Sequence, residues 1–200
     1  MIIDLVRHAS TGRRGYFDGR TDPPLIVAAA ETVRDAHCGI AWTRVISSPL
    51  QRAHDTALAM AKERAVPVER DADWAECHFG DWEGRHHQDI AAQDGGGVLA
   101  AFHRDPINAA PPNAEPWPQF QSRLQRALQA MVTQGDTTEP VLVVSHAGAI
   151  RMAISVACGF PWPSLWALRL DYGTRVRLSV HADGGTLWGE LLEVSQPCVA

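Results

Sequence analysis

The chain has 200 residues, of which 46% are hydrophobic and 20% are charged. This length and composition suit one domain folded around one core, and they exclude a disordered chain. The formal net charge of −5 disfavours a broad electrostatic interaction with nucleic acid or anionic lipid, so we expect neither partner. Any anion-binding site must therefore be local.

Apolar runs in the sequence are far shorter than the ~20 residues that a membrane span needs. The first residues also lack the basic and then apolar pattern of a leader peptide. We therefore expect a cytoplasmic protein that does not bind membranes. The cysteines are scattered and form no Cys-x-x-Cys pair, and we expect reduced thiols at Cys38, Cys77, Cys158 and Cys198.

Short apolar runs alternate with stretches of helical spacing along the chain. This pattern predicts strands over residues 1–6, 42–46 and 141–144, and helices over residues 27–37, 50–64, 120–132 and 149–158. Near the end, residues 175–181 and 186–194 flank an Asp-Gly pair, which is typical of a hairpin. The alternation predicts an α/β fold, a three-layer α/β/α sandwich with a mainly parallel central sheet and an antiparallel edge strand.

Glycine and proline interrupt this pattern in the middle of the chain. The triplet Gly95-Gly96-Gly97 and the five prolines of residues 105–118 are predicted to break helices and central strands. We interpret residues 85–118 as an insertion or cap that arches over the sheet. No linker, repeat or low-complexity segment is visible, so we predict a single domain over residues 1–200.

Cationic and imidazole side chains follow the three predicted strands. Arg7 and His8 end the first, His146 follows the third, and Arg52 lies on the opening turn of the helix after the second, where Ser48 suits the N-cap position. Ligands collect at the carboxyl ends of parallel strands, and helix N-termini favour anions. Because guanidinium groups match the oxygens of phosphate, these residues predict a phosphate site.

Five further blocks of sequence motifs follow one another along the chain, at residues 5–8, 18–25, 47–53, 75–84 and 145–148. In this order, the blocks resemble the histidine phosphatase superfamily, the phosphoglycerate mutase-like group. The Gly-Arg-Thr-Asp and Phe-Gly-Asp-Trp-Glu-Gly blocks are most similar to the alpha-ribazole phosphatases of cobalamin synthesis. The resemblance extends from residue 1 to about residue 177.

The resemblance implies a role for each matching residue. His8 would be the catalytic nucleophile that takes up the phosphoryl group, and Glu76 would be the proton donor. Contacts to the phosphoryl oxygens would come from Arg7, Arg52 and His146, with His146 counted among the catalytic groups, and from the hydroxyl of Thr11. Since these side chains neutralise the phosphate charge, no metal or other cofactor is required.

The chemistry places two demands on these groups. The His8 imidazole must be neutral, with its second nitrogen donating to a nearby acceptor, and the Glu76 carboxyl must hold a proton for the leaving group. We therefore predict a metal-independent phosphomonoester hydrolase that forms phosphohistidine at His8. Its substrate would be a phosphorylated small molecule, with alpha-ribazole 5′-phosphate favoured.

Some positions depart from the family pattern. Ala9 and Ser10 stand where the family commonly has Gly and Glu, and a pocket Asn is absent from residues 12–17. Alternatives therefore stay open: a phosphoglycerate mutase-type phosphotransferase, a catalytically weak protein that binds a phosphorylated ligand, or metal-dependent hydrolysis near His78. The spacing of the polar residues around His78 fits no familiar metal site, and we interpret Glu83 there as scaffolding.

Overall fold

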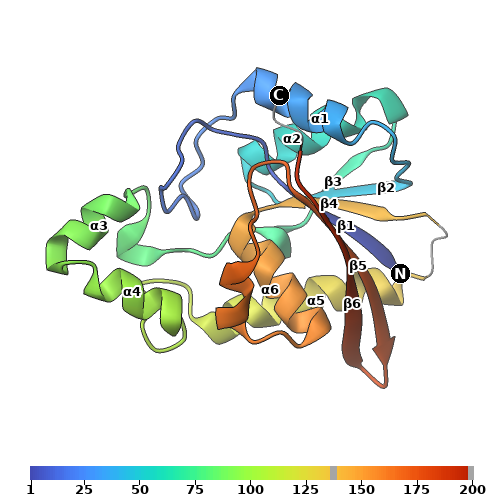
Figure 1. Ribbon diagram of the computed structural model, residues 1–200. Helices are drawn as coiled ribbons and strands as arrows, with labels where there is room; N and C mark the ends of the chain where they lie inside the picture. Colours follow the sequence, from blue (N-terminus) through green and yellow to red (C-terminus); the bar gives the residue numbers. More distant parts are fainter. Residues whose placement is uncertain (136–138, 198–200) are drawn as a thin grey trace.

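The computed structural model describes residues 1–135 and 139–197 (Figure 1). This part of the chain forms one sheet in the order β3-β2-β4-β1-β5-β6. The strands are β1 (Ile2–Arg7), β2 (Arg44–Ser47), β3 (Val68–Arg70), β4 (Val141–Ser145), β5 (Arg175–Asp183) and β6 (Thr186–Ser195). The first four strands pair in parallel, whereas β5 pairs antiparallel with β1 and β6 pairs antiparallel with β5. The predicted mainly parallel sheet with an antiparallel edge is confirmed.

Helices cover both faces of the sheet. They are α1 (Val27–Ala36), α2 (Gln51–Ala61), α3 (His87–Asp94), α4 (Gly97–Arg104), α5 (Trp117–Thr133) and α6 (Ala147–Cys158). Short 3₁₀ helices follow several of these elements: η1 (Lys62–Arg64), η2 (Ala72–Trp74), η3 (Gly80–Trp82) and η4 (Trp162–Ala167). Figure 1 shows α1 and α2 on one side of the sheet and α5 and α6 on the other.

Strand alternation produces the two apolar layers. On one face, Val6 and Val144 pack with α1 and α2 in a cluster that includes Ala53. On the opposite face, Leu5 and Val143 pack with α5 and α6. Because successive side chains of the central parallel strands are buried on opposite faces, these strands read as continuous apolar runs in the sequence. The three-layer arrangement follows from this double burial.

One local prediction is wrong, because Ser48 is not an N-cap: the chain stays extended through Leu50, and α2 begins at Gln51. The glycine triplet does break the helices, since Gly95 and Gly96 are left-handed between α3 and α4 and only Gly97 lies in a helix. Among the prolines of residues 105–118, only Pro118 lies in a helix, in the first turn of α5, where its missing N–H removes no helical hydrogen bond. The three-residue strand β3 was not predicted, because it is too short to show a period in the sequence.

The segment of residues 85–118 contains α3 and α4. Figure 1 shows these two helices set apart from the sheet, on the side where β1 ends. No helix in the described part of the chain is long and apolar enough to cross a membrane. Free thiols are present at Cys38, Cys77 and Cys158, whereas Cys198 lies outside the described residues.

Candidate active site

Two imidazoles meet at the carboxyl end of the sheet. Strands β1 and β4 are neighbours, with Arg7 opposite Ser145, so the residues that follow them lie side by side. The ring centroids of His8 and His146 are 5.0 Å apart. Only 6% of His8 and 1% of His146 is exposed to solvent. The sheet therefore brings the two predicted histidines into one buried site.

The surroundings of His8 determine which ring nitrogen is free. Its Nδ1 lies 2.8 Å from the carbonyl oxygen of Ala9. A carbonyl oxygen can only accept, so Nδ1 donates and Nε2 keeps its lone pair. Burial lowers the pKa of His8 well below its usual range, and the positive charges of Arg7 and Arg52 lower it further. His8 is therefore a neutral imidazole at pH 7, with the acceptor that the sequence analysis required.

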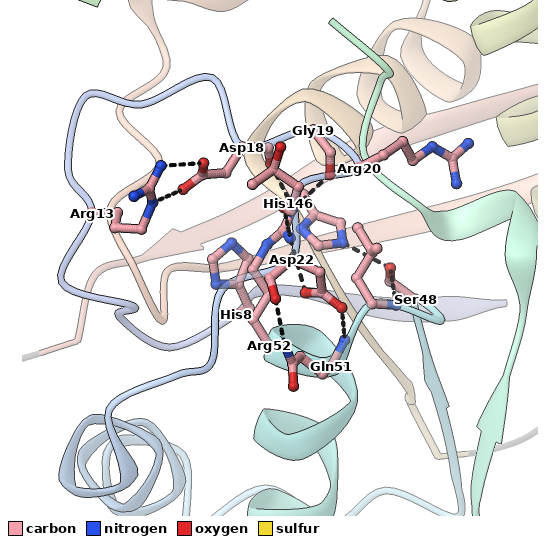
Figure 2. Close-up of polar contacts among 12 residues, drawn as sticks. His8, Arg13, Asp18, Gly19, Arg20, Asp22, Ser48, Gln51, Arg52 and His146 are labelled. Carbon is pink, nitrogen blue, oxygen red and sulfur yellow. Dashed lines mark hydrogen bonds and ion pairs between the residues drawn. The ribbon is translucent and has the colours of Figure 1, made fainter. Parts of the chain in front are cut away.

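His146 contacts a serine that directly follows the neighbouring strand β2. The Oγ of Ser48 lies 2.7 Å from Nε2 of His146, as Figure 2 shows, and it also accepts the N–H of Leu50 at 3.3 Å. Within the described residues, Nδ1 of His146 has no hydrogen-bond partner. Burial lowers the pKa of His146 well below its usual range, followed by the charge of Arg52. A second neutral imidazole thus has one ring nitrogen without a partner among the described residues.

Arg7 brings a buried positive charge to the same place. Its Nη1 donates to the carbonyl oxygen of Leu170 at 2.6 Å, and its guanidinium carbon lies 4.0 Å from the centroid of the Tyr172 ring. The Tyr172 ring also lies 5.4 Å from the ring of His8. Nothing in the sequence pattern marked Tyr172 as a site residue, because it follows no predicted strand and lies in none of the motif blocks.

Arg52 is almost fully buried and is held by a loop. Its two terminal nitrogens donate to the carbonyl oxygens of Asp18 at 2.6 Å, Gly19 at 2.9 Å and Thr21 at 2.8 Å. A fourth bond, to the carboxylate of Asp22, measures 3.1 Å. Figure 2 shows this loop, residues 18–22, lying against the guanidinium. The sequence predicted Arg52 as a site residue, but it did not predict that loop 18–22 would accept the hydrogen bonds of the guanidinium.

Glu76 lies at the N-terminus of α6. Its carboxylate accepts the N–H groups of Cys77 at 3.0 Å, Gly148 at 2.9 Å and Ala149 at 3.0 Å. Helix N-termini stabilise negative charge, which explains why the carboxylate of Glu76 binds the first N–H groups of α6. Gly148 is required for this contact, because a Cβ there would lie 2.4 Å from Oε1 of Glu76. The first turn of α6 thus fixes the carboxyl of Glu76 beside His146.

One cavity of about 230 Å³ joins five of the six predicted site residues, and His146 is not among its lining residues. Its polar part is lined by Arg7, His8, Thr11, Arg52 and Glu76. The remaining wall is mostly aromatic and includes Phe17, Phe79, Phe102, Trp117, Trp162, Trp166 and Tyr172. In the described part of the chain, the indole Nε1 atoms of Trp162 and Trp166 have no hydrogen-bond partner. The cavity therefore has a cationic end beside an aromatic end.

The side chains around His78 make local contacts instead of forming a cluster of ligands. His78 accepts the N–H of Gly80 at 3.1 Å, and His86 accepts the N–H of Gln88 at 3.2 Å. Among residues 1–135 and 139–197, no three His, Cys, Asp or Glu side chains lie in an arrangement that could hold a metal ion.

The fold and this arrangement of imidazole, guanidinium and carboxyl groups define a histidine phosphatase, and comparison with known proteins agrees. Residues 3–189 match the family model of the histidine phosphatase superfamily, branch 1, and the chain belongs to this superfamily. It is 30% identical over 192 residues to the adenosylcobalamin/alpha-ribazole phosphatase of Escherichia coli (strain K12), with 94% of each chain covered.

Solved structures give the same result. The alpha-ribazole phosphatase from Shigella flexneri superposes with a TM-score of 0.75 at 28% identity, covering 96% of both chains. A mycobacterial glucosyl-3-phosphoglycerate phosphatase in complex with VO3 superposes with a TM-score of 0.84 at 25% identity, covering 95% of this chain and 96% of that chain. The phosphoglycerate mutase-like fold predicted from the sequence is confirmed.

Proposed function

We propose that this histidine phosphatase hydrolyses phosphomonoesters without a metal, through a phosphohistidine at His8. The observation that carries the proposal is the neutral, buried imidazole with Nε2 free, in one cavity with Arg7, Arg52 and Glu76. Phosphoryl transfer requires an in-line nucleophile and positive charge around the phosphoryl oxygens, and it needs little else from the protein.

In the first step, the Nε2 lone pair of His8 attacks phosphorus. The bond from phosphorus to the ester oxygen breaks, and the carboxyl of Glu76 gives its proton to the departing alkoxide. The products of this step are an alcohol, phosphohistidine and the carboxylate form of Glu76.

In the second step, water attacks the phosphohistidine. Glu76 removes a proton from the water, the bond between phosphorus and Nε2 breaks, and inorganic phosphate forms. His8 returns to its neutral form and Glu76 to its protonated form, so atoms and charges balance over the cycle. The hydrogen bond from Nδ1 to the carbonyl of Ala9 holds the ring in one tautomer throughout.

The phosphoryl oxygens would be held from several sides. We assign the Ser48 hydroxyl as the donor to Nε2 of His146, because that hydroxyl already accepts from Leu50. His146 then presents an Nδ1–H to a phosphoryl oxygen. Arg7 and Thr11 would contact further oxygens, and Arg52 would add its positive charge, which acts strongly in a site shielded from water.

The favoured substrate is alpha-ribazole 5′-phosphate. Two observations support it: the printed names of the relatives, and the aromatic wall, which suits stacking on an aromatic base. We also propose that residues 85–118 act as a cap, since Phe102 and His103 of α4, together with Trp117, line the cavity. The free thiols and acidic net charge support a cytoplasmic enzyme acting on small molecules.

A panel of phosphomonoesters tests the proposal. Ranking alpha-ribazole 5′-phosphate, 3-phosphoglycerate, glucosyl-3-phosphoglycerate and p-nitrophenyl phosphate by kcat/KM measures the specificity directly. His8→Ala should abolish turnover, and quenching with alkaline detergent, in which phosphohistidine is stable, should trap label from ³²P-labelled substrate on the wild-type protein only. His54→Ala is the matched control, because His54 contacts Ser47 and is absent from the lining of the cavity.

Four results would overturn the proposal. Hydrolysis by His8→Ala at the wild-type rate would remove the nucleophile assignment. Transfer of phosphate between phosphoglycerates in the presence of a bisphosphate primer would favour the mutase alternative. Tight binding of phosphomonoesters without turnover or labelled histidine would favour a ligand-binding protein. Loss of activity with a chelator would point to metal-dependent hydrolysis.

A further inference from the structure

The loop of residues 18–22 lies between two side chains of opposite charge. On one side, Arg52 donates to its carbonyl oxygens, as described above and shown in Figure 2. On the other side, the carboxylate of Glu83 accepts the N–H of Arg20 at 2.9 Å and the N–H of Thr21 at 2.8 Å. It also accepts the hydroxyl of Thr21 at 2.8 Å. A cation thus holds the oxygens of the loop and an anion holds its nitrogens.

One peptide group connects the two charges directly. The carbonyl of Gly19 accepts from Arg52, and the N–H of Arg20, in the same peptide group, donates to Glu83. A trans peptide is planar, and its C=O and N–H point in opposite directions. Fixing the N–H on Glu83 therefore fixes the direction in which the carbonyl faces Arg52.

Glu83 is itself anchored and charged. It accepts the N–H of Phe79 at 2.8 Å, which closes the turn that contains η3. Burial raises the pKa of Glu83, but hydrogen bonds from the N–H groups of Phe79, Thr21 and Arg20 outweigh it and leave the pKa below its usual value. The loop packs tightly on this turn, since a Cβ on Gly19 would lie 2.2 Å from the carbonyl oxygen of Cys77 and from Oε1 of Glu83.

We infer that Glu83 is a positioning residue that acts through loop 18–22 on Arg52, and so sets the affinity of the site for the phosphoryl group. Arg52 reaches the site from α2, and the described contacts of its terminal nitrogens all go to this loop. If the loop carbonyls turn away, the guanidinium follows them or loses its partners, and its charge moves relative to His8. The inference rests on the proposed function, in which this charge faces the phosphoryl oxygens.

Glu83→Gln tests the inference with little change of shape. The glutamine amide has one acceptor oxygen and two N–H donors, so it cannot accept all four of the present hydrogen bonds. We expect the Kd for inorganic phosphate, measured by calorimetry, to rise roughly tenfold. We expect kcat/KM to fall by the same factor for p-nitrophenyl phosphate and for an alkyl phosphate. Amide exchange at Arg20 and Thr21 should become faster.

Asp81→Asn is the matched control. It makes the same chemical change two residues earlier, on a side chain that contacts Asn113 at the surface at 2.8 Å. Its phosphate Kd and kcat/KM should stay within twofold of wild type. If Glu83→Gln does not fold, Thr21→Val replaces it, because this change removes only the hydroxyl bond to Glu83. Thr21→Val should raise the phosphate Kd about two- to threefold.

Two results would overturn the inference. One is a wild-type phosphate Kd in Glu83→Gln, or in Thr21→Val where the first variant is unfolded. The other is a loss of kcat/KM confined to the alkyl phosphate, which would mean that Glu83 acts on proton transfer by Glu76. Failure of the proposed function would look different: the wild-type protein would bind phosphate, weakened in Glu83→Gln, but would not hydrolyse any ester.

Discussion

Ser48→Ala removes the hydrogen bond that orients His146, together with the longer one that Ser48 accepts from the N–H of Leu50. The two atoms are 2.7 Å apart, and Ser48 and His146 are 0% and 1% exposed, so water cannot replace the lost hydroxyl. Leaving a buried polar atom unsatisfied costs about 1–3 kcal/mol. We expect this cost to apply to the transition state, in which the Nδ1–H of His146 faces the phosphoryl group. Because 1.36 kcal/mol corresponds to a factor of ten, kcat/KM should then fall about 5- to 150-fold.

The assay is steady-state hydrolysis of p-nitrophenyl phosphate, with stability followed by urea unfolding. Ser47→Ala is the control, because Ser47 is the adjacent buried serine and its Oγ lies 3.0 Å from Nδ1 of a different histidine, His54. Both variants should lose stability, but only Ser48→Ala should lose activity. A kcat/KM for Ser48→Ala within twofold of that for Ser47→Ala would refute the assignment of Ser48 as the group that orients His146.

Three further predictions concern the other groups of the cavity. Glu76→Gln should lower kcat by ~10²–10⁴-fold for an alkyl phosphate and by much less for p-nitrophenyl phosphate, whose leaving group needs no proton; equal losses would contradict the role of Glu76. Trp166→Ala should lower the ratio of kcat/KM for phenyl phosphate over methyl phosphate about two- to tenfold, and an unchanged ratio would remove Trp166 from the leaving-group site. Because burial and nearby arginines lower the pKa of His8 and His146, the unfolded chain takes up protons below about pH 6.5 while the folded protein does not. The free energy of unfolding should therefore fall between pH 7.5 and pH 5.5, and less steeply in His8→Asn; the same slope in both proteins would show that His8 does not contribute.

The sequence contained enough information for the central sheet and its edge. Strands buried on both faces appear as uninterrupted apolar runs, and β1 and β4 were predicted within one residue of their ends. The Asp-Gly pair marked the hairpin between β5 and β6, because such a turn depends on neighbouring residues alone. Elements whose ends depend on contacts from elsewhere were less predictable. Helix α2 begins later than an N-cap at Ser48 would place it, and the carboxylate of Asp22 from a distant loop accepts the N–H of Gln51 at 2.6 Å.

By itself, the sequence determined which residues could form the site, since each predicted cation or imidazole follows a strand and parallel strands end at a common edge. Only the tertiary structure decided how these groups are connected. Ser48 contacts His146 across 98 positions of the chain, and Glu76 meets the first turn of α6 more than 70 residues away. Hydrogen bonds depend on distances of a few tenths of an ångström and on direction, and these are set by the packing of whole elements. A local sequence pattern does not contain these distances and directions.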